Sequence, residues 1–327
     1  MINPKLFRQA LLRWYSRHGR DLPWRRTRSP YEILVSEVML QQTQVATVLG
    51  YYNRWLRRFP NFKALARATE NDVLHAWQGL GYYRRARNLR ETAKIIQRQH
   101  GGIFPEDLGA IGELPGLGRY SANAIASFAF DQSVPIVEAN TSRVLARLFN
   151  LRMPIDQGPG RTALWNYAAM LVPTRGAAAY NSALMDLGAL VCLPKPKCPI
   201  CPVREFCRAR QPEGLPIKKP LPRIKQLVEN HALVIERNRI LLRRSNHRWR
   251  GMWILPPLKL DRFKRSSLQD PIYESAFPFT CHRVKLRIFR KSRPARETHM
   301  QRWFSFRQLH SIPIPSPHRR AITALLN

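Results

Sequence analysis

Glu37 stands in a segment where a carboxyl group could act as a general acid. Residues 29–40 begin with a serine that is typical of a helix N-cap, and they read as a helix. Helical spacing places Ile33 and Leu40 on the same face as Glu37, so we expect its carboxyl group to be buried on an apolar stripe and its pKa to be raised. An acid that stays protonated near neutral pH could donate a proton, whereas the alternative is an ordinary glutamate paired with an arginine. The glutamine-rich segment 41–44, which offers amides to bases, favours catalysis.

A glycine turn and a second carboxylate follow further along the chain. The segment 114–118, Leu-Pro-Gly-Leu-Gly, is predicted to join two helices, and Gly116 and Gly118 permit a turn whose backbone N–H groups point outward. Such amides at the start of a helix can hold a phosphate, although the turn alone indicates no more than a helix–helix connection. Glu138 is then expected at the entrance to another helix.

Four cysteines lie close together in a proline-rich loop. Four thiolates can hold structural zinc or a [4Fe-4S] cluster, and spacing alone does not decide between these two centres. Disulfides are the third interpretation, which a reducing compartment disfavours. The basic residues Lys195, Lys197 and Arg204 suggest that the loop faces phosphates. The expected ligands are Cys192, Cys198, Cys201 and Cys207.

The composition indicates a polyanionic partner. The 327 residues include 55 Lys and Arg against 21 Asp and Glu, which gives a formal net charge of +34 and favours nucleic acid. A merely basic surface or adhesion to anionic lipid is the alternative. However, no apolar run reaches the length of a membrane span, and the N-terminal residues do not resemble a secretory signal. We therefore expect a cytoplasmic protein associated with the nucleoid through DNA, and no membrane partner.

The pattern of apolar residues predicts two domains. Residues 1–207 carry helical spacing and end in the cysteine loop 192–207, and residues 208–227 have the proline-rich, basic composition of a linker. Residues 228–327 alternate apolar and polar side chains in several short runs and end in a helical segment from His318 to Leu326. The predicted fold is a mainly α N-terminal region followed by a smaller α+β C-terminal domain.

Four motifs together closely resemble the A/G-mismatch adenine DNA glycosylases. They are the segment 36–44 around Glu37, the segment 79–83 (Gly-Leu-Gly-Tyr-Tyr), the 114–118 hairpin and the cysteine loop. They occur in the order of that family, and the resemblance covers nearly the whole chain. It implies a helix-hairpin-helix region that flips adenine out of duplex DNA, a [4Fe-4S] cluster, and a Nudix-like domain that senses 8-oxoguanine. We expect a monomer that acts on duplex DNA bearing a mismatched adenine.

The resemblance also assigns roles to individual residues. Glu37 corresponds to the acid that protonates the adenine ring, and Glu138 to the second catalytic carboxylate. The remaining expected positions are Tyr120 and Asn140 on the sugar side, Trp24 and Arg25 in the adenine pocket, and Gln42 and Tyr82 as residues inserted into the base stack. Tyr120 stands where the related endonuclease III group has the lysine that forms a Schiff base. This difference implies a monofunctional glycosylase that leaves an abasic site.

The sequence departs from the family pattern at three places. Glu138-Ala139-Asn140 replaces an Asp-Gly-Asn sequence, and the extra methylene moves the carboxylate by roughly 1.5 Å. The loop between the first two cysteines is one residue shorter than is usual. In the C-terminal domain, Phe279-Thr280-Cys281 replaces Phe-Ser-His, so Thr280 either contacts 8-oxoguanine or simply ends a strand.

Alternative functions follow from these departures. A related glycosylase for another mismatched or damaged base would fit the altered segment 279–281. A DNA-binding homologue with weakened catalysis would fit the change at Glu138. The glutamate pair of Nudix hydrolases is absent, so we do not expect hydrolysis of nucleotides.

Overall fold

The structure is a computed structural model that describes residues 2–220, 224–258 and 270–326. The chain divides into two units, Met1–Lys63 with Glu91–Pro220, and Ala64–Arg90 with Leu221–Asn327. Each unit is considered by itself. The sequence-based division into residues 1–207, 208–227 and 228–327 stays a prediction, with strand β1 beginning at Lys225.

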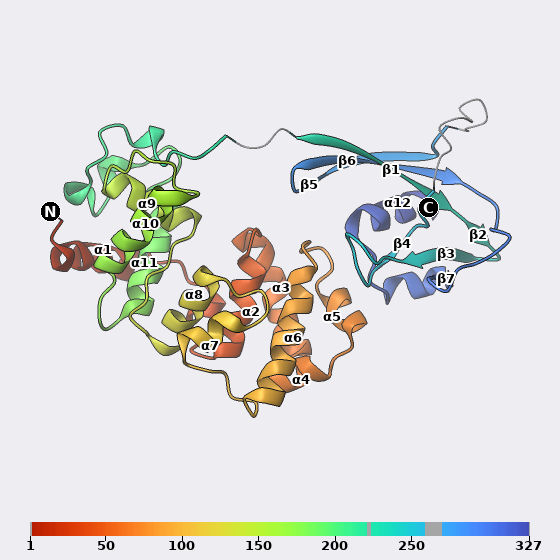
Figure 1. Cartoon of the computed structure of the whole chain (residues 1–327), viewed down its shortest axis with the longest axis horizontal. Helices are drawn as coiled ribbons and strands as arrows, with labels where there is room; N and C mark the ends of the chain where they lie inside the picture. Colours follow the sequence, from red (N-terminus) through yellow and green to blue (C-terminus); the bar gives the residue numbers. More distant parts are fainter. Residues whose placement is uncertain (1, 221–223, 259–269, 327) are drawn as a thin grey trace. The chain divides into compact units, whose positions relative to one another are not determined.

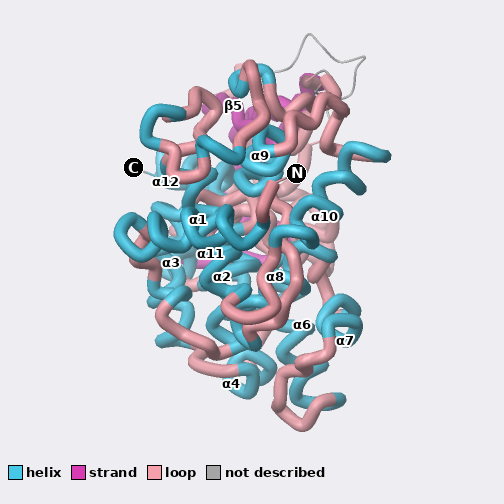
Figure 2. The backbone as a smooth tube through the Cα atoms, turned by 90° about the vertical axis from the view of Figure 1, so that its left-hand side faces the viewer, coloured by secondary structure: helices cyan, strands magenta, loops and turns pink. Residues whose placement is uncertain are grey.

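Helices form all the regular structure of the described residues before Lys225 (Figures 1 and 2). This confirms the predicted mainly α N-terminal region. The α-helices are α1 (Pro4–His18), α2 (Pro30–Leu40), α3 (Val45–Arg58), α4 (Phe62–Arg67), α5 (Glu70–Ala76), α6 (Arg84–Gln99), α7 (Leu108–Glu113), α8 (Arg119–Phe130), α9 (Ala139–Leu148), α10 (Gly158–Leu171) and α11 (Ala177–Leu190). Short 3-10 turns are η1 (Pro23–Arg25), η2 (Cys198–Ile200), η3 (Arg204–Phe206) and η4 (Pro212–Gly214).

Local sequence explains where the helices of the site begin. Ser29 caps α2 by accepting a hydrogen bond from the backbone N–H of Glu32, as the sequence predicts. Gly116 turns the chain between α7 and α8 with a φ of 81°, a conformation that glycine adopts without strain. Gly118 is the N-cap of α8, and its lack of a side chain leaves the first amides of this helix uncapped.

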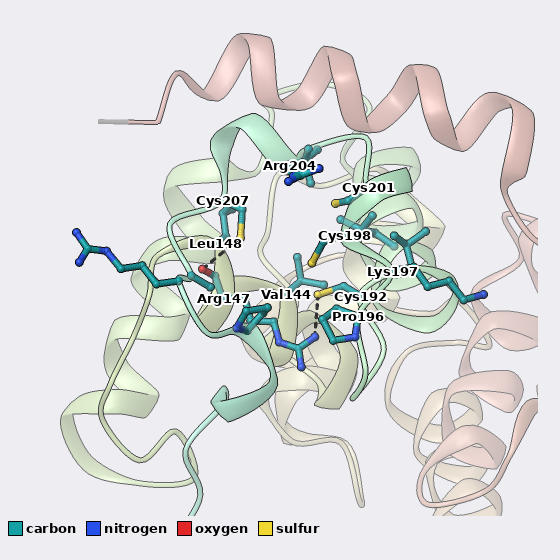
Figure 3. A pocket seen from close by; sticks show the side chains of 16 residues that line it. Val144, Arg147, Leu148, Cys192, Pro196, Lys197, Cys198, Cys201, Arg204 and Cys207 are labelled. Carbon is teal, nitrogen blue, oxygen red and sulfur yellow. Dashed lines mark hydrogen bonds between the residues drawn. The ribbon is translucent and has the colours of Figure 1, made fainter.

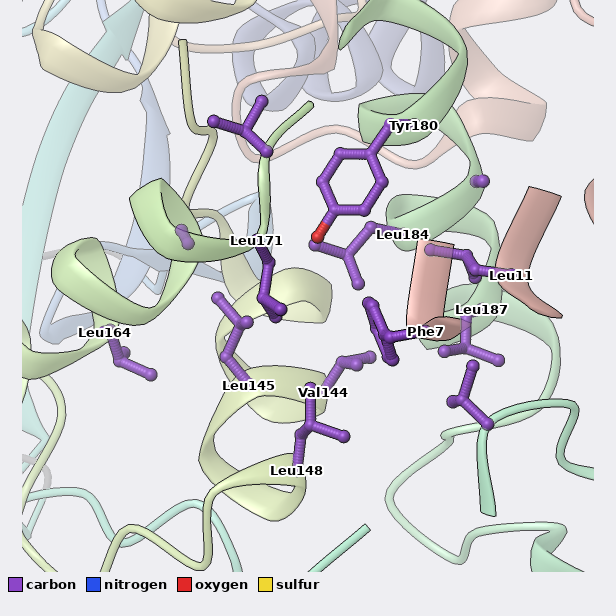
Figure 4. Close-up of a cluster of buried hydrophobic side chains, with 14 of the residues drawn as sticks. Phe7, Leu11, Val144, Leu145, Leu148, Leu164, Leu171, Tyr180, Leu184 and Leu187 are labelled. Carbon is purple, nitrogen blue, oxygen red and sulfur yellow. The ribbon is translucent and has the colours of Figure 1, made fainter. Parts of the chain in front are cut away.

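A hydrophobic core joins α1, α9, α10 and α11 (Figure 4). Phe7 and Leu11 from α1 are fully buried, and they belong to the same cluster as Val144 from α9 and Leu184 from α11. This packing therefore fixes the position of helix α11 relative to helix α9. The approach is close at Gly188, where an added Cβ would lie only 2.7 Å from Cβ of Asn140.

The C-terminal part contains two small sheets and a helix, which confirms the predicted α+β character. One sheet has the order β1-β6-β5, with β1 (Lys225–Leu233) parallel to β6 (His282–Arg290) and β5 (Tyr273–Phe279) antiparallel to β6. In the other, β3 (Arg239–Arg244) pairs with β2 (Ile235–Glu236), β4 (Trp253–Ile254) and β7 (Gln301–Ser305). The chain then continues through η6 (Phe306–His310) to α12 (Ser316–Leu326).

Candidate active site

Glu37 is buried in the middle of α2, with an exposed fraction of 3%. The hydroxyl group of Tyr120, the second residue of α8, donates a hydrogen bond of 2.9 Å to its Oε2. Burial raises the pKa of Glu37 to about 7, the hydroxyl of Tyr120 and the charge of Arg25 oppose this rise, and Glu138 adds to it. Glu37 can therefore hold or release a proton near neutral pH.

A cavity of about 740 Å³ opens beside Glu37. Its wall brings together seven of the residues that the sequence proposes for the site, although they come from η1, from α2 and the turn after it, and from the N-terminal ends of α8 and α9. These residues are Trp24, Arg25, Glu37, Gln42, Tyr120, Glu138 and Asn140. A cavity of this size can hold a flipped nucleobase, because binding pockets for small molecules have volumes of roughly 300–1,000 Å³.

Glu138 is the N-cap of α9, which confirms the predicted helix entrance. Its Oε1 accepts a 2.8 Å hydrogen bond from the backbone N–H of Thr141, and the hydroxyl of Thr141 accepts a 2.8 Å bond from the backbone N–H of Glu138. Burial raises the pKa of Glu138, while the amides of Asn140 and Thr141 and the charges of Arg143 and Arg20 oppose that rise. The longer glutamate side chain thus reaches back to its own helix while it still lines the cavity.

Asn140 is held at the start of α9 by a neighbouring arginine. Its Oδ1 accepts a 2.8 Å hydrogen bond from Arg143, which also donates to the carbonyl oxygens of Gly188 and Cys192 at 2.6 Å. Arg143 thereby ties the start of α9 to the C-terminal end of α11 and to the cysteine loop. No pattern in the sequence around Arg143 predicted this role.

Asp186 on α11 is a second residue that sequence reasoning missed. Its carboxylate has no exposed surface, and it accepts hydrogen bonds of 2.6 and 2.8 Å from the two terminal nitrogens of Arg25. It also accepts bonds of 2.8 Å from both the backbone N–H and Nε of Arg20. A signal was present, because an aspartate between Met185 and Leu187 on an apolar helix requires a charged partner.

Gln42 and Trp24, two further site residues proposed from the sequence, belong to the first unit and differ in their exposure. Gln42 is exposed and has a φ of 56°, a left-handed conformation that is strained for a side chain of this kind. Trp24 is only 7% exposed, and its ring packs edge-on against Tyr52 with ring centroids 5.4 Å apart. One part of the Trp24 side chain therefore belongs to the core, while another part lines the cavity.

Tyr82 and Thr280 belong to the second unit and do not line the cavity. Tyr82 is 47% exposed with a φ of 44°, so it shares with Gln42 an exposed side chain on strained backbone. Thr280 and Cys281 form the two-residue turn between β5 and β6, in which Phe279 pairs with His282 and Thr280 has a φ of 52°. The guanidinium of Arg248 lies 4.3 Å from the ring centroid of Phe279.

The four cysteines surround a separate cavity of about 340 Å³ (Figure 3). All four are free thiols, and their sulfur atoms are spread around the space. Arg147 donates a 3.3 Å hydrogen bond to Sγ of Cys192, and the thiol of Cys207 donates to the backbone carbonyl of Arg147 at 3.6 Å. Within residues 2–220, 224–258 and 270–326, no group of three or more His, Cys, Asp or Glu side chains could hold a single metal ion.

Among the described residues, no helix is both long enough and apolar enough to cross a bilayer.

The chain resembles solved structures of DNA glycosylases and of endonuclease III. A thermostable thymine-DNA glycosylase matches with a TM-score of 0.58 and 32% identity, covering 63% of this chain and 95% of the other. Endonuclease III in a non-covalent complex with DNA matches with a TM-score of 0.54 and 22% identity, covering 65% of this chain and 97% of the other. At that lower identity the likeness shows the fold alone.

Sequence comparisons are more specific than the structural ones. The pattern of the HhH-GPD superfamily base excision DNA repair proteins matches residues 35–166. The adenine DNA glycosylase of Homo sapiens is 45% identical over 219 residues, which cover 63% of this chain and 39% of the human protein. That of Buchnera aphidicola subsp. Schizaphis graminum is 30% identical over 342 residues, which cover 97% of this chain and 98% of the relative. With the buried acid, the hairpin and the cysteine loop in place, these matches show that the chain belongs to the adenine DNA glycosylase family.

Proposed function

We propose that this protein is a DNA glycosylase that hydrolyses the N-glycosidic bond of adenine mispaired with 8-oxoguanine or guanine in duplex DNA, and leaves an abasic site. The observation that carries the proposal is the buried Glu37, hydrogen-bonded to Tyr120 in the wall of a cavity large enough for a base. The names of the relatives point to the same substrate.

Glu37 acts as the general acid in this proposal. Adenine is a poor leaving group until its ring is protonated, and a carboxyl group with a pKa of about 7 can supply that proton at neutral pH. The hydroxyl of Tyr120 fixes the carboxyl group at Oε2, so that the proton is presented from a defined position. General acid catalysis of this kind contributes roughly 10²- to 10⁴-fold in rate.

Glu138 and Asn140 stabilise the sugar as the bond breaks. The departing adenine leaves positive charge on the deoxyribose, and a carboxylate in the cavity wall lowers the energy of that charge. The amides at the start of α9 hold Glu138, which restricts where its carboxylate can lie. Arg143 in turn orients the amide of Asn140.

Contacts with duplex DNA come from exposed backbone and side chains. The uncapped amides at the start of α8, after Gly116 and Gly118, are suited to a phosphate. Gln42 and Tyr82, each exposed on strained backbone, are suited to fill the space left by the flipped nucleotide. The net charge of +34 adds a large non-specific attraction that falls with salt concentration.

Preference for adenine opposite 8-oxoguanine is assigned to the turn at Thr280. Thr280 is exposed at the tip of the β5–β6 hairpin, and its hydroxyl donates a 2.7 Å hydrogen bond to the carbonyl oxygen of Phe279, so that its oxygen can still accept a bond from a base. The substitution Thr280→Gly removes the hydroxyl, and glycine tolerates the φ of 52° at this position. We expect the variant to bind A:8-oxoguanine and A:guanine duplexes with equal affinity; a retained preference would instead support a purely structural turn.

The cysteine loop fits a [4Fe-4S] cluster. All four cysteines line one cavity of about 340 Å³, and the similarity to adenine DNA glycosylases favours the cluster over structural zinc, which four thiolates could also bind. Cys192, Cys198, Cys201 and Cys207 would be its ligands. A bound cluster would cross-link the loop and so stabilise it, and the hydrogen bond from Arg147 to Cys192 would support one ligand.

A second candidate is a glycosylase for another mismatched base, which the likeness to the thymine-DNA glycosylase favours. One experiment separates the candidates. The protein is incubated with duplexes that carry adenine opposite 8-oxoguanine, adenine opposite guanine, or thymine opposite guanine, and each is then treated with alkali. Strand breaks at adenine support the proposal, and breaks at thymine support the second candidate. Binding without breaks would contradict both and indicate a DNA-binding homologue.

A further inference from the structure

The carboxylate of Asp186 connects two arginines in the wall of the main cavity. It accepts two hydrogen bonds from the guanidinium of Arg25, in a bidentate arrangement, and two more from Arg20. It has no exposed surface, whereas Arg20 and Arg25 both line the cavity. Three of these bonds come from the two guanidinium groups and the fourth from the backbone N–H of Arg20, so one buried carboxylate fixes the position of both side chains.

Arg25 lies close enough to Glu37 for the two charges to interact. Its positive charge favours the ionised form of Glu37, which acts against the retention of a proton on this acid. A half-buried arginine here without a counter-ion would therefore favour the carboxylate form of Glu37 at neutral pH. The carboxylate of Asp186, bonded directly to the same guanidinium, offsets that charge.

On the basis of the proposed function, we propose that Asp186 is a positioning residue for adenine release. Asp186 fixes Arg25 in the cavity wall and balances the charge of Arg25, so that Glu37 can keep its proton. Asp186 itself acts through Arg25 and does not act on the base. Arg25 also donates to the backbone carbonyl oxygen of Arg20 at 3.2 Å, so its guanidinium is held at the wall of the cavity proposed for the base.

The other groups that bear on Glu37 come from two elements. Tyr120 from α8 donates a hydrogen bond to it, and Glu138 at the N-cap of α9 repels its negative charge. Helix α3 also packs against α2, but among the described residues it adds no charged group that shifts the pKa of Glu37. The Arg25–Asp186 pair can thus be substituted while Tyr120 and Glu138 keep their own side chains, and Arg20, which binds Asp186 and whose charge acts on Glu138, is present in every variant.

The test compares Asp186→Asn with Arg25→Gln. Titration of Glu37 is followed by NMR of protein labelled with ¹³C at the glutamate carboxyl carbon, with the signal assigned by its loss in Glu37→Gln. We expect the midpoint to fall by roughly one pH unit in Asp186→Asn and to rise in Arg25→Gln. The double variant, which removes both charges, should return close to the wild-type midpoint. The exposed ion pair of Asp21 with Arg26 supplies the control, because Asp21→Asn should leave the midpoint unchanged.

The same variants are then assayed for adenine release under single-turnover conditions, where the decline in rate at high pH should move with the NMR midpoint. Midpoints that are unchanged, or that move in the same direction in both single variants, would overturn the inference. If Asp186→Asn does not fold, the double variant decides, because loss of the Asp186 charge should place its midpoint below that of Arg25→Gln, and equal midpoints in these two variants would overturn the inference. Wild-type protein that releases no adenine would contradict the proposed function, while the titration would still test the charge balance by itself.

Discussion

Tyr120 and Glu37 are 83 residues apart in the sequence and are joined by a hydrogen bond of 2.9 Å from the tyrosine hydroxyl to Oε2 of the glutamate. The bond links the helix that follows the glycine hairpin to the helix that carries the acid. In the proposed function, the first amides of the same helix α8 hold a DNA phosphate, while Tyr120 fixes the acid. The following predictions test this arrangement.

Burial of Glu37 should reduce the stability of the folded protein above neutral pH. Its folded-state pKa of about 7 lies above the ordinary value of 4.5, so the folded state retains a proton that the unfolded state releases, and stability falls as pH rises between these values. The variant Glu37→Gln carries no charge and avoids this loss. We expect it to exceed wild type in the free energy of unfolding by about 3 kcal/mol near pH 8 and to match it near pH 4. Urea denaturation at both pH values measures the difference; equal stability near pH 8 would contradict the raised pKa.

Substitutions of Glu138 should separate helix capping from charge. Glu138→Gln keeps an oxygen that can accept the hydrogen bond from Thr141, so stability should be retained while adenine release slows by about tenfold or more. Glu138→Ala also loses the cap, which costs about 1 kcal/mol. Thermal melting and single-turnover kinetics on both variants check this. A rate for Glu138→Gln equal to that of wild type would exclude the proposed role at the sugar.

Tyr120 predicts a monofunctional enzyme. A lyase step requires an amine that forms a Schiff base with the sugar, and the position after the hairpin carries a hydroxyl hydrogen-bonded to Glu37 instead. Incubation with substrate DNA and sodium borohydride should therefore yield no covalent protein–DNA complex. The variant Tyr120→Lys serves as the comparison, since it introduces an amine beside the cavity. Efficient trapping with wild type would show that another amine acts.

The cysteine loop should require a cluster for stability. Cys198→Ser removes one proposed ligand, so protein prepared without oxygen should lose the brown absorbance and most of its iron and should melt at a lower temperature. Cys281→Ser is the matched control, because this thiol lies in the β5–β6 turn of the second unit. Iron content by elemental analysis and absorbance spectra decide the result. Zinc in the wild-type protein, with no iron, would favour the alternative centre.

Local patterns were sufficient for much of the fold and for the acid. Helical spacing around Glu37 predicted its burial, and the structure confirms an exposed fraction of 3%. The turn between β2 and β3 is formed by the polar pair Arg237 and Asn238, which have positive φ values of 45° and 60°. These features depend on neighbours within one or two helical turns or one hairpin, which the sequence displays directly.

Other features depend on contacts between distant segments and could not be predicted in this way. The pairing of Asp186 with Arg20 and Arg25 spans more than 160 residues, and only the packing of α11 brings these charges together. The capping interaction of Glu138 was also missed, because the sequence comparison suggested a displaced carboxylate and not one that bonds to its own helix. The packing of Trp24 against Tyr52 likewise requires the fold to be known.

The most direct test of the central claim is single-turnover adenine release from an A:8-oxoguanine duplex by wild type, Glu37→Gln and Glu32→Gln. Glu32 lies on the same helix α2 and does not line the cavity, so its variant controls for a general effect of losing a glutamate there. We predict release by wild type and Glu32→Gln at similar rates, declining as pH rises through about 7, and a loss of at least about 10²-fold in Glu37→Gln. A Glu37→Gln rate within a few-fold of wild type would contradict the assignment of Glu37 as the acid.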